Sequence, residues 1–405
     1  MMKLNVYSEI APLKDVLLHR PGKELDNLTP ALLEKLLFDD IPFLDVAREE
    51  HDAFANVLRS HGVTVHYLTD LVAEAIEAAP HAASNFIDQF IEDAQVKSEA
   101  VKKAVKTYLE SMQPLAMVET MIAGIRTTEI DVPRQDAIMD LLTSEYPFHT
   151  DPMPNILFQR DPFATIGCGI ALNKMSTRTR HRETLFSDFI FTHHPQFANQ
   201  INRYYSRKDA YSLEGGDILV LNEKTLAIGI SKRSDPRALQ QLAETLFASD
   251  EPFETVLAFN IPKTRAFMHL DTVFTQIDEG IFTVHPGIMK SLTVFEITKA
   301  QKGSVVQKVE APLEVILEKH LDRPIELIPC GGDDVVHSER EQWNDGANTL
   351  AIAPGKVVVY SRNVVTNALL KSKGITVLEI PSSELSRGRG GPRCMSMPLY
   401  RNAND

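Results

Sequence analysis

The stretch DILVLNEKTLAIGI, Asp217–Ile230, sets the pattern from which the fold is predicted. Its alternating apolar residues predict two strands around a turn at Asn222–Lys224. The next segment, DPRALQQLAETLFA, predicts a helix, because Asp235 is a suitable N-cap and Pro236 fits the first helical position. Another strand, FETVLAFNI, follows at Phe253–Ile261. The predicted order is therefore strand, strand, helix, strand.

The same order returns later in the chain. Hairpins are predicted over Asp271–Pro286, with a turn at Asp278–Gly280, and over Asn348–Ser361, with a turn at Pro354–Lys356. The helices and strands that complete these two units are predicted around Leu313–His320, at Pro324–Ile328, up to Lys373 and at Ile375–Ile380. Repetition of one supersecondary unit is typical of folds built from stacked or radially arranged copies.

Two further units are less regular. DPFATIGCGIALN, Asp161–Asn173, opens one of them, and RHRETLFSDFIFTHHP follows it. The other begins at Asp15–Arg20 and is interrupted by extra helix, including Asp45–Ser60. It ends in LRSHGVTVHYL, Leu58–Leu68, which aligns without a gap with LKSKGITVLEI, Leu370–Ile380. Each of these two segments reads as a helix end, a glycine and then a strand.

Five such units predict an α/β protein in which small mixed sheets form a closed ring, like blades about an axis. Loops at equivalent places in each unit then meet at one end of that axis. Residues 72–147 break the rhythm, because they are rich in helix formers and contain IDQFIEDAQVKSEAVKKAVKTYLESM, which offers no strand. We therefore expect a catalytic ring of residues 1–71 and 148–405, with a helical insertion at 72–147.

Composition and charge narrow the class of protein. The 405 residues are 43% hydrophobic and 24% charged, which is ordinary for a globular chain with a large core. The formal net charge of −13 argues against nucleic acid or an anionic membrane as the main partner. No apolar run approaches the roughly 18 residues of a membrane span, and the N-terminus does not read as a secretory signal. Three cysteines, a sparse and odd number, favour reduced thiols and a cytoplasmic location.

Chemically capable side chains stand at matching places, just before the predicted hairpins. These segments read FQRDPF, SLEGGD, FMHLD and CGGDD, and the slot after the last strand reads RGRGGPRC. Each residue alone has a structural explanation, because aspartates and glycine pairs are common in turns. Their shared register predicts that five side chains converge if the ring closes: Asp161, Glu214, His269, Asp271 and Cys394.

That set suits the chemistry of a planar cation. A thiolate is a strong nucleophile, and the neighbouring Arg389 and Arg393 are expected to lower the pKa of the Cys394 thiol. His269 transfers protons near neutral pH. The two aspartates accept hydrogen bonds only when ionised, so they grip a guanidinium and leave its central carbon open to attack.

The motifs FQRDPF, LEGGD, HLDTVF and GRGGPRCMSMP together resemble those of bacterial arginine deiminases. The resemblance covers essentially the whole chain, and the chemical positions match the family pattern. It implies the five-bladed α/β propeller of the guanidine-modifying superfamily. It also implies hydrolysis of L-arginine to L-citrulline and ammonia in arginine catabolism, without a metal or organic cofactor, by a homo-oligomer that is a dimer or larger.

The resemblance further implies a role for each residue. Cys394 is the nucleophile that forms an amidino-cysteine (thiouronium) intermediate, and Asp161 and Asp271 hold the guanidinium. Glu214 and His269 supply the acid and base. The residues implied to bind the rest of the substrate are Asn155, Arg180 and Arg233 at the α-carboxylate, Phe163 beside the stem, and Arg389 on a mobile loop.

Other functions fit the sequence less well. The sequence has none of the HExxH, paired CxxC or HxH spacings that are typical of a zinc hydrolase. Its GCG and PGK segments are incomplete as nucleotide-binding motifs. If the protein were a non-enzymatic propeller, the shared register of the acids, the histidine and the cysteine would have no explanation. Within the superfamily, an agmatine deiminase or an amidinotransferase remains an alternative. Agmatine has no carboxylate for Arg180 and Arg233, and a transferase needs a second amine. Cys168 and Cys330 are expected to be bystanders.

Overall fold

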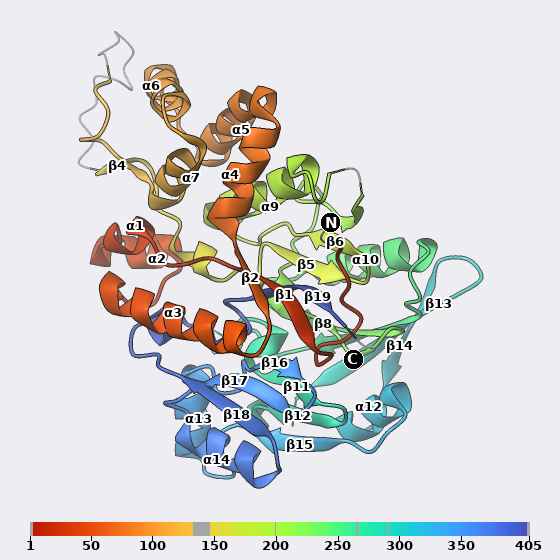
Figure 1. Cartoon of the computed structure of the whole chain (residues 1–405). Coiled ribbons are helices and arrows are strands. Elements are labelled where there is room, and N and C mark those ends of the chain that lie inside the picture. Colours follow the sequence, from red (N-terminus) through yellow and green to blue (C-terminus); the bar gives the residue numbers. More distant parts are fainter. Residues whose placement is uncertain (1–2, 133–145, 199, 265, 290, 403–405) are drawn as a thin grey trace.

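The computed structural model describes residues 3–132, 146–198, 200–264, 266–289 and 291–402 (Figure 1). Within them, the strands form five sheets of three or more strands and one two-stranded sheet. A group of helices from the first third of the chain lies at the top of Figure 1, and the larger sheets lie below it. The chain is therefore a mixed α/β protein, as expected.

The unit predicted from Asp217–Ile230 is present. β8 (Ile218–Val220) and β9 (Thr225–Ile230) are antiparallel, α10 (Pro236–Ala248) follows, and β10 (Thr255–Asn260) lies parallel to β9. The Asp235 carboxylate caps α10 by accepting a hydrogen bond from the Arg237 amide at 2.9 Å.

The same order recurs in three more sheets. In each of them the first two strands are antiparallel, and the strand after the helix is parallel to the second. The elements are β5 (Phe163–Ile166), β6 (Gly169–Leu172), α9 (His181–His193) and β7 (Asn202–Tyr205); β11 (Phe274–Asp278), β12 (Ile281–Val284), α12 (Leu313–Leu321) and β15 (Glu326–Pro329); and β16 (Leu350–Ala353), β17 (Lys356–Tyr360), α14 (Val364–Ser372) and β18 (Thr376–Ile380).

The fifth unit joins the two ends of the chain. β1 (Leu13–Leu18) lies parallel to β2 (Thr64–Tyr67), which follows α3 (Leu44–Ser60). The remaining strand is β19 (Met397–Arg401), which is antiparallel to β1. The sequence analysis did not predict β19, because the strand is short and belongs to a unit that begins at the opposite end of the chain.

The alignment of Leu58–Leu68 with Leu370–Ile380 reflects two identical helix ends. Gly62 and Gly374 have φ angles of +79° and +83°, a left-handed conformation that favours glycine. The amide after each glycine donates to the carbonyl five residues earlier, at 3.1 Å in both cases. This is a Schellman-type helix end, so the glycines are needed for their backbone conformation.

A second hairpin was not predicted. β13 (Thr293–Lys299) pairs with β10, and β14 (Ser304–Val309) pairs with β13, which extends the central sheet to five strands. β14 forms the edge of that sheet, and most of its residues are exposed. Its residues therefore do not alternate between buried apolar and exposed polar positions, which is the pattern from which the other strands were predicted.

The helical segment consists of α4 (Leu68–Ala78), α5 (Pro80–Asp93), α6 (Glu99–Glu110) and α7 (Pro114–Ala123). Phe86 of α5 packs against Phe189 of α9 with ring centroids 4.4 Å apart, so the helices share an apolar core with a neighbouring unit. The short β3 (Ile125–Arg126) pairs with β4 (Phe148–Thr150) at the end of this segment. Part of the predicted insertion, residues 133–145, lies outside the described residues.

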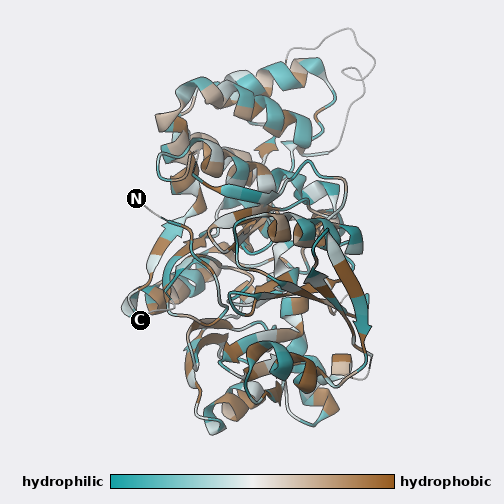
Figure 2. Cartoon of the chain, turned by 90° about the vertical axis from the view of Figure 1, so that its right-hand side faces the viewer, coloured by the Kyte–Doolittle hydropathy of each residue, from teal (hydrophilic) through white to brown (hydrophobic). Residues whose placement is uncertain are grey.

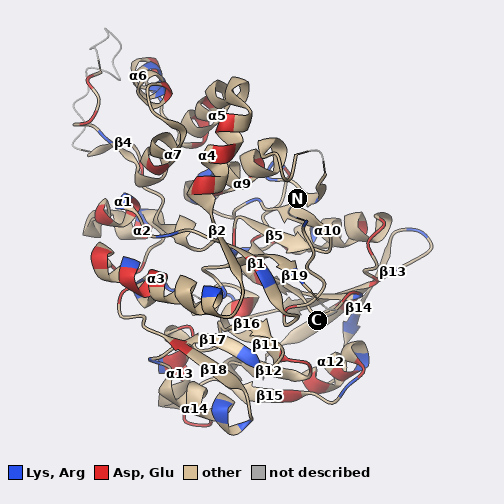
Figure 3. Cartoon of the chain, in the orientation of Figure 1, with Lys and Arg blue, Asp and Glu red and all other residues tan. Residues whose placement is uncertain are grey.

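The remaining short helices are α1 (Lys23–Asp26), α2 (Leu33–Leu36), α11 (Pro286–Met289) and α13 (Val335–Trp343). Figure 2 shows helices with both hydrophilic and hydrophobic residues, and Figure 3 shows basic and acidic residues interspersed along the helices. Among the described residues, no helix has the length and apolar character that crossing a membrane requires.

Candidate active site

The five side chains predicted to converge do so. Asp161 precedes β5, Glu214 precedes β8, His269 and Asp271 precede β11, and Cys394 precedes β19. Their exposed fractions lie between 0% and 4%. Equivalent loops of four sheets thus bring one thiol, one imidazole and three carboxylates into a single buried cluster.

The cluster contains a histidine held between carboxylates. His269 Nε2 lies 2.8 Å from Glu214 Oε2, and His269 Nδ1 lies 3.7 Å from Asp161 Oδ1. Burial lowers the pKa of His269, but Asp161, Glu214 and Asp217 raise it more, to about 9. Burial raises the pKa of Glu214, whereas Arg233, His269 and Arg180 together hold it well below its usual range. The imidazole is therefore protonated at neutral pH and is suited to donate a proton.

Asp217 holds this histidine loop in place. Its carboxylate accepts hydrogen bonds from the Ser231 and Ser234 hydroxyls, both at 2.6 Å, and from the Leu270 amide at 2.8 Å. Because Leu270 directly follows His269, these contacts fix the backbone beside the imidazole. The sequence analysis quoted the LEGGD motif but assigned no role to its last residue.

The thiol lies beside a carboxylate. Cys394 Sγ is 3.6 Å from Asp271 Oδ2, and Arg393 Nη1 is 2.8 Å from the same oxygen. Burial raises the pKa of the Cys394 thiol well above its usual range, Asp271 and Asp161 raise it further, and Arg393 opposes them. Arg393 lowers this pKa, as expected, but burial and the carboxylates outweigh it, and Arg393 is itself paired with Asp271 and Glu9.

Asn348 joins the nucleophile loop to the Asp271 loop. Its Oδ1 accepts a hydrogen bond from the Cys394 amide at 2.9 Å, and its Nδ2 donates to the Asp271 carbonyl at 3.0 Å. Asn348 stands two residues before β16, the equivalent place in the unit of β16, β17 and β18. The sequence analysis assigned that place to CGGDD, Cys330–Asp334, but α13 separates this segment from β16.

Arg180 is the main departure from the implied substrate contacts. Its guanidinium donates to Asp161 Oδ2 at 2.8 Å and to both oxygens of Glu183, and it lies 3.7 Å from Glu214 Oε2. The side chain is 2% exposed. Binding of a substrate carboxylate by Arg180 remains a prediction, and it requires the guanidinium to leave these partners.

The other three polar residues implied to bind substrate each contact protein groups in this structure. Asn155 donates to the Leu36 carbonyl at 2.5 Å. Arg233 Nη1 lies 3.7 Å from Glu214 Oε1. The Arg389 guanidinium carbon lies 3.5 Å from the centre of the Trp343 ring, a cation–π contact.

The structure does not place Phe163 beside these polar groups. Its side chain is fully buried in the apolar core, with its ring centroid 5.0 Å from that of Phe191. Phe158 and Phe38 both meet the glycine-rich loop: a Cβ at Gly388 would come within 3.0 Å of either ring, and a Cβ at Gly390 within 3.0 Å of the Phe158 ring. A contact of Phe163 with the substrate stem therefore remains a prediction.

The other two cysteines lie elsewhere. Cys168 is exposed in the turn between β5 and β6, with Sγ 3.2 Å from the Tyr7 hydroxyl. Cys330 is buried near Thr366, and burial raises its pKa to about 12. Within the described part of the chain, neither cysteine forms a hydrogen bond with Cys394 or with the acids around it.

Three of the site residues have donor atoms that suit a metal ion. Each of Asp161, Glu214 and His269 offers one ligand atom, and these three atoms lie within 4.8 Å of one another. The Arg180 guanidinium already contacts two of these residues, so its positive charge opposes a further cation.

The His269 pKa predicts how stability depends on pH. The folded protein binds this proton more tightly than the unfolded chain, whose histidines have a pKa near 6.5. We therefore expect the free energy of unfolding to fall, by on the order of 3 kcal/mol, as pH rises from about 6.5 to 9. Urea denaturation of the wild type and of His269→Gln across this range measures the effect. Equal pH slopes in the two proteins would contradict the assignment.

The fold resembles that of two solved structures. A dimethylarginine dimethylaminohydrolase adduct with S-methyl-L-thiocitrulline matches with a TM-score of 0.52 and 14% identity, over 95% of this chain and 99% of that one. The inosamine-phosphate amidinotransferase of Streptomyces griseus matches with a TM-score of 0.53 and 14% identity, over 99% and 98%. At these identities the similarity defines the fold class: the chain has the mixed α/β fold of these proteins.

Sequence comparison gives the family. The arginine deiminase family model matches residues 34–401. The arginine deiminase of Clostridium perfringens is 56% identical over 405 residues, which cover 98% of each chain. That of Treponema denticola is 51% identical over 406 residues, which cover 99% of each chain. The chain belongs to the arginine deiminase family.

Proposed function

We propose that this protein hydrolyses L-arginine to L-citrulline and ammonia through a covalent amidino-cysteine intermediate. The observation that carries the proposal is the buried cluster itself: a thiol, a protonated imidazole and three carboxylates from four loops. The family membership supports the same reaction. Neither a binding module nor a structural protein needs a nucleophile, a proton donor and two guanidinium acceptors in one place.

In this mechanism Asp161 and Asp271 hold the substrate guanidinium. The contact between Asp161 and the Arg180 guanidinium supports the idea, because it is the same kind of ion pair within the same pocket. Substrate then replaces Arg180 at Asp161, and the released Arg180 turns to the substrate carboxylate. Arg233 and Asn155 complete the site for the amino-acid end.

The substrate cation also activates the nucleophile. The buried Cys394 thiol is neutral while only carboxylates face it, and a guanidinium placed beside it favours the thiolate. As the substrate cation binds, the thiol gives its proton to solvent, and the thiolate attacks the guanidinium carbon and forms the S–C bond. His269 gives its proton to the departing nitrogen, the C–N bond breaks and ammonia leaves.

Hydrolysis of the intermediate reverses the role of the histidine. Neutral His269 takes a proton from water, and the hydroxide adds to the amidino carbon. The S–C bond then breaks, so that citrulline leaves and the cysteine is free. Glu214 stabilises the protonated state of the imidazole in both halves of the reaction.

Agmatine deimination and amidino transfer are the competing reactions. Arginine and agmatine are incubated separately with the purified protein, and citrulline, carbamoylputrescine and ammonia are measured. We expect equal amounts of citrulline and ammonia from arginine, and at least about 100-fold less turnover of agmatine, because the buried arginines then lack their anionic partner. Adding glycine tests for transfer. Turnover of agmatine alone, or guanidinoacetate in place of citrulline, would overturn the proposal.

We also propose that the five larger sheets close into a five-bladed propeller, made of residues 1–71 and 148–405. Pairing between the C-terminal β19 and the N-terminal β1 supports this, because it joins the last part of the chain to the first unit. In this proposal residues 72–147 form a helical insertion between the first two blades. The convergence of equivalent loops at one cluster follows from such a ring.

A further inference from the structure

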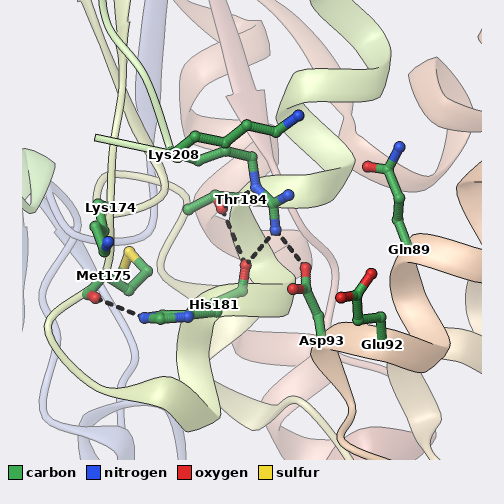
Figure 4. A pocket seen from close by; sticks show the side chains of 9 residues that line it. Gln89, Glu92, Asp93, Lys174, Met175, His181, Thr184 and Lys208 are labelled. Carbon is green, nitrogen blue, oxygen red and sulfur yellow. Dashed lines mark hydrogen bonds and ion pairs between the residues drawn. The ribbon is translucent and has the colours of Figure 1, made fainter. Parts of the chain in front are cut away.

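A second polar cavity lies apart from the catalytic cluster, between the helical segment and the unit that carries Arg180 (Figure 4). Its volume is about 320 Å³, which is large enough for a small metabolite. α5 forms one wall, and the loop before α9, the start of α9 and the segment after β7 form the others. Neither the reaction proposed above nor the family match assigns a role to it.

Some of the charged groups around the cavity are already paired. Arg207 forms an ion pair with Asp93 and donates to the Thr184 hydroxyl at 2.9 Å. His181 Nε2 donates to the Met175 carbonyl at 3.0 Å. These contacts form the framework of the cavity and leave little net charge for a ligand.

Three polar side chains around the cavity have no protein partner among the described residues: Gln89, Glu92 and Lys208. Lys174 Nζ makes one hydrogen bond, to the Asp209 carbonyl at 2.7 Å, and an ammonium group has three donors. Figure 4 shows Gln89 and Glu92 on the α5 side, and Lys174 on the other side. The available groups are therefore an acid and an amide facing two ammonium groups.

We propose that this cavity binds a free α-amino acid as a zwitterion. Its carboxylate lies at Lys174 and Lys208, and its ammonium group lies at Glu92 and Gln89. A ligand with only a negative charge meets Glu92 unfavourably, and one with only a positive charge meets the lysines unfavourably. A zwitterion matches both walls at once.

The cavity is connected to the catalytic cluster by a short stretch of chain. Between Lys174 and His181 lie Ser176, which donates to Glu214 from both its amide and its hydroxyl at 2.8 Å, and Arg180, which binds Asp161. We expect a ligand that binds to Lys174 to shift the chain between Lys174 and His181. Occupancy is thus expected to alter kcat/KM for arginine, an effect that rests on the proposed function, whereas binding itself does not.

Binding is tested with three matched probes: L-norvaline, pentanoate, which lacks its ammonium group, and butylamine, which lacks its carboxylate. Calorimetric titration of the full-length protein is expected to detect norvaline only. Lys208→Met and Glu92→Gln are each expected to weaken norvaline binding about tenfold, the loss of one charge-assisted hydrogen bond. Lys103→Met, an exposed lysine on α6, is the control and leaves binding unchanged.

Two outcomes would overturn the proposal. One is no binding of norvaline to the wild type. The other is binding that Lys208→Met and Glu92→Gln leave unchanged, which would place the amino acid in the catalytic cluster instead. Because these titrations involve no turnover, they are independent of whether the protein deiminates arginine. An effect on kcat/KM is then measured separately with norvaline present.

Discussion

Cys394→Ser is expected to lower kcat by about 10⁴-fold or more and to leave the fold intact. Serine is nearly isosteric, so the buried loop keeps its packing, including the hydrogen bond from residue 394 to Asn348. The hydroxyl is a much weaker nucleophile than a thiolate. The carboxylates around it are too weak as bases to remove its proton. Loss of a covalent nucleophile removes most of the rate enhancement, as known for enzymes of this type.

The measurement combines steady-state ammonia release with thermal denaturation. Cys168→Ser is the matched control, because that thiol is exposed in a turn and should leave kcat unchanged. Mass spectrometry of wild-type protein quenched during arginine turnover should detect an amidino adduct on the peptide that contains Cys394. Wild-type turnover by Cys394→Ser would end the covalent mechanism.

Local sequence patterns predicted three of the repeated units well, those that begin at Asp217, Asp271 and Asn348, and only the opening of a fourth, at Asp161–Asn173. In the first three, a hairpin with a Gly- or Asn-containing turn is followed by a helix and a strand, and the structure has these elements at the predicted places. β19 could not be predicted in this way, since its partner β1 lies at the opposite end of the chain. β14 was not predicted for a different reason. It is an exposed edge strand, so its residues lack the alternation of apolar and polar side chains that the half-buried strands show.

The site was predicted in its composition but not in its electrostatics. Asp161, Glu214 and Asp271 were found because each stands before a recognisable hairpin. Asn348 was missed although the hairpin Asn348–Ser361 was predicted, because the place before that hairpin was assigned to Cys330–Asp334. The charge state of Cys394 could not be derived from flanking arginines, because sequence does not reveal how strongly burial and the carboxylates of Asp271 and Asp161 outweigh Arg393.

Arg180 illustrates the same difficulty. A surface arginine and a substrate-binding arginine look alike in sequence, and neither description fits the side chain in this structure. It is buried, and Asp161 and Glu183 bind it. Two buried acids around one guanidinium offset the cost of removing that charge from water. In this structure Asp161, which we propose to hold the substrate guanidinium, binds the guanidinium of Arg180.

Asp271→Asn is the second large effect we expect, with kcat/KM for arginine lowered by about 10²- to 10⁴-fold. Asparagine keeps the shape of the side chain but loses its charge. The substrate cation then lacks one of its two carboxylates, and loss of one partner of a buried ion pair costs about 3–5 kcal/mol. Arg393 keeps Glu9 as a partner, so the variant should remain folded.

The direction of the thiol pKa makes this prediction specific. The Asp271 carboxylate raises the pKa of Cys394, so its removal alone should make the free thiol easier to ionise. Alkylation of Cys394 by iodoacetamide in the absence of substrate should therefore begin at a lower pH in Asp271→Asn than in the wild type, although turnover falls. Asp333→Asn, at an exposed aspartate, is the control for both measurements. Unchanged kcat/KM in Asp271→Asn would remove this carboxylate from substrate binding. Reduced kcat/KM without the shift in alkylation would mean that Asp271 acts on the substrate but does not control the thiol.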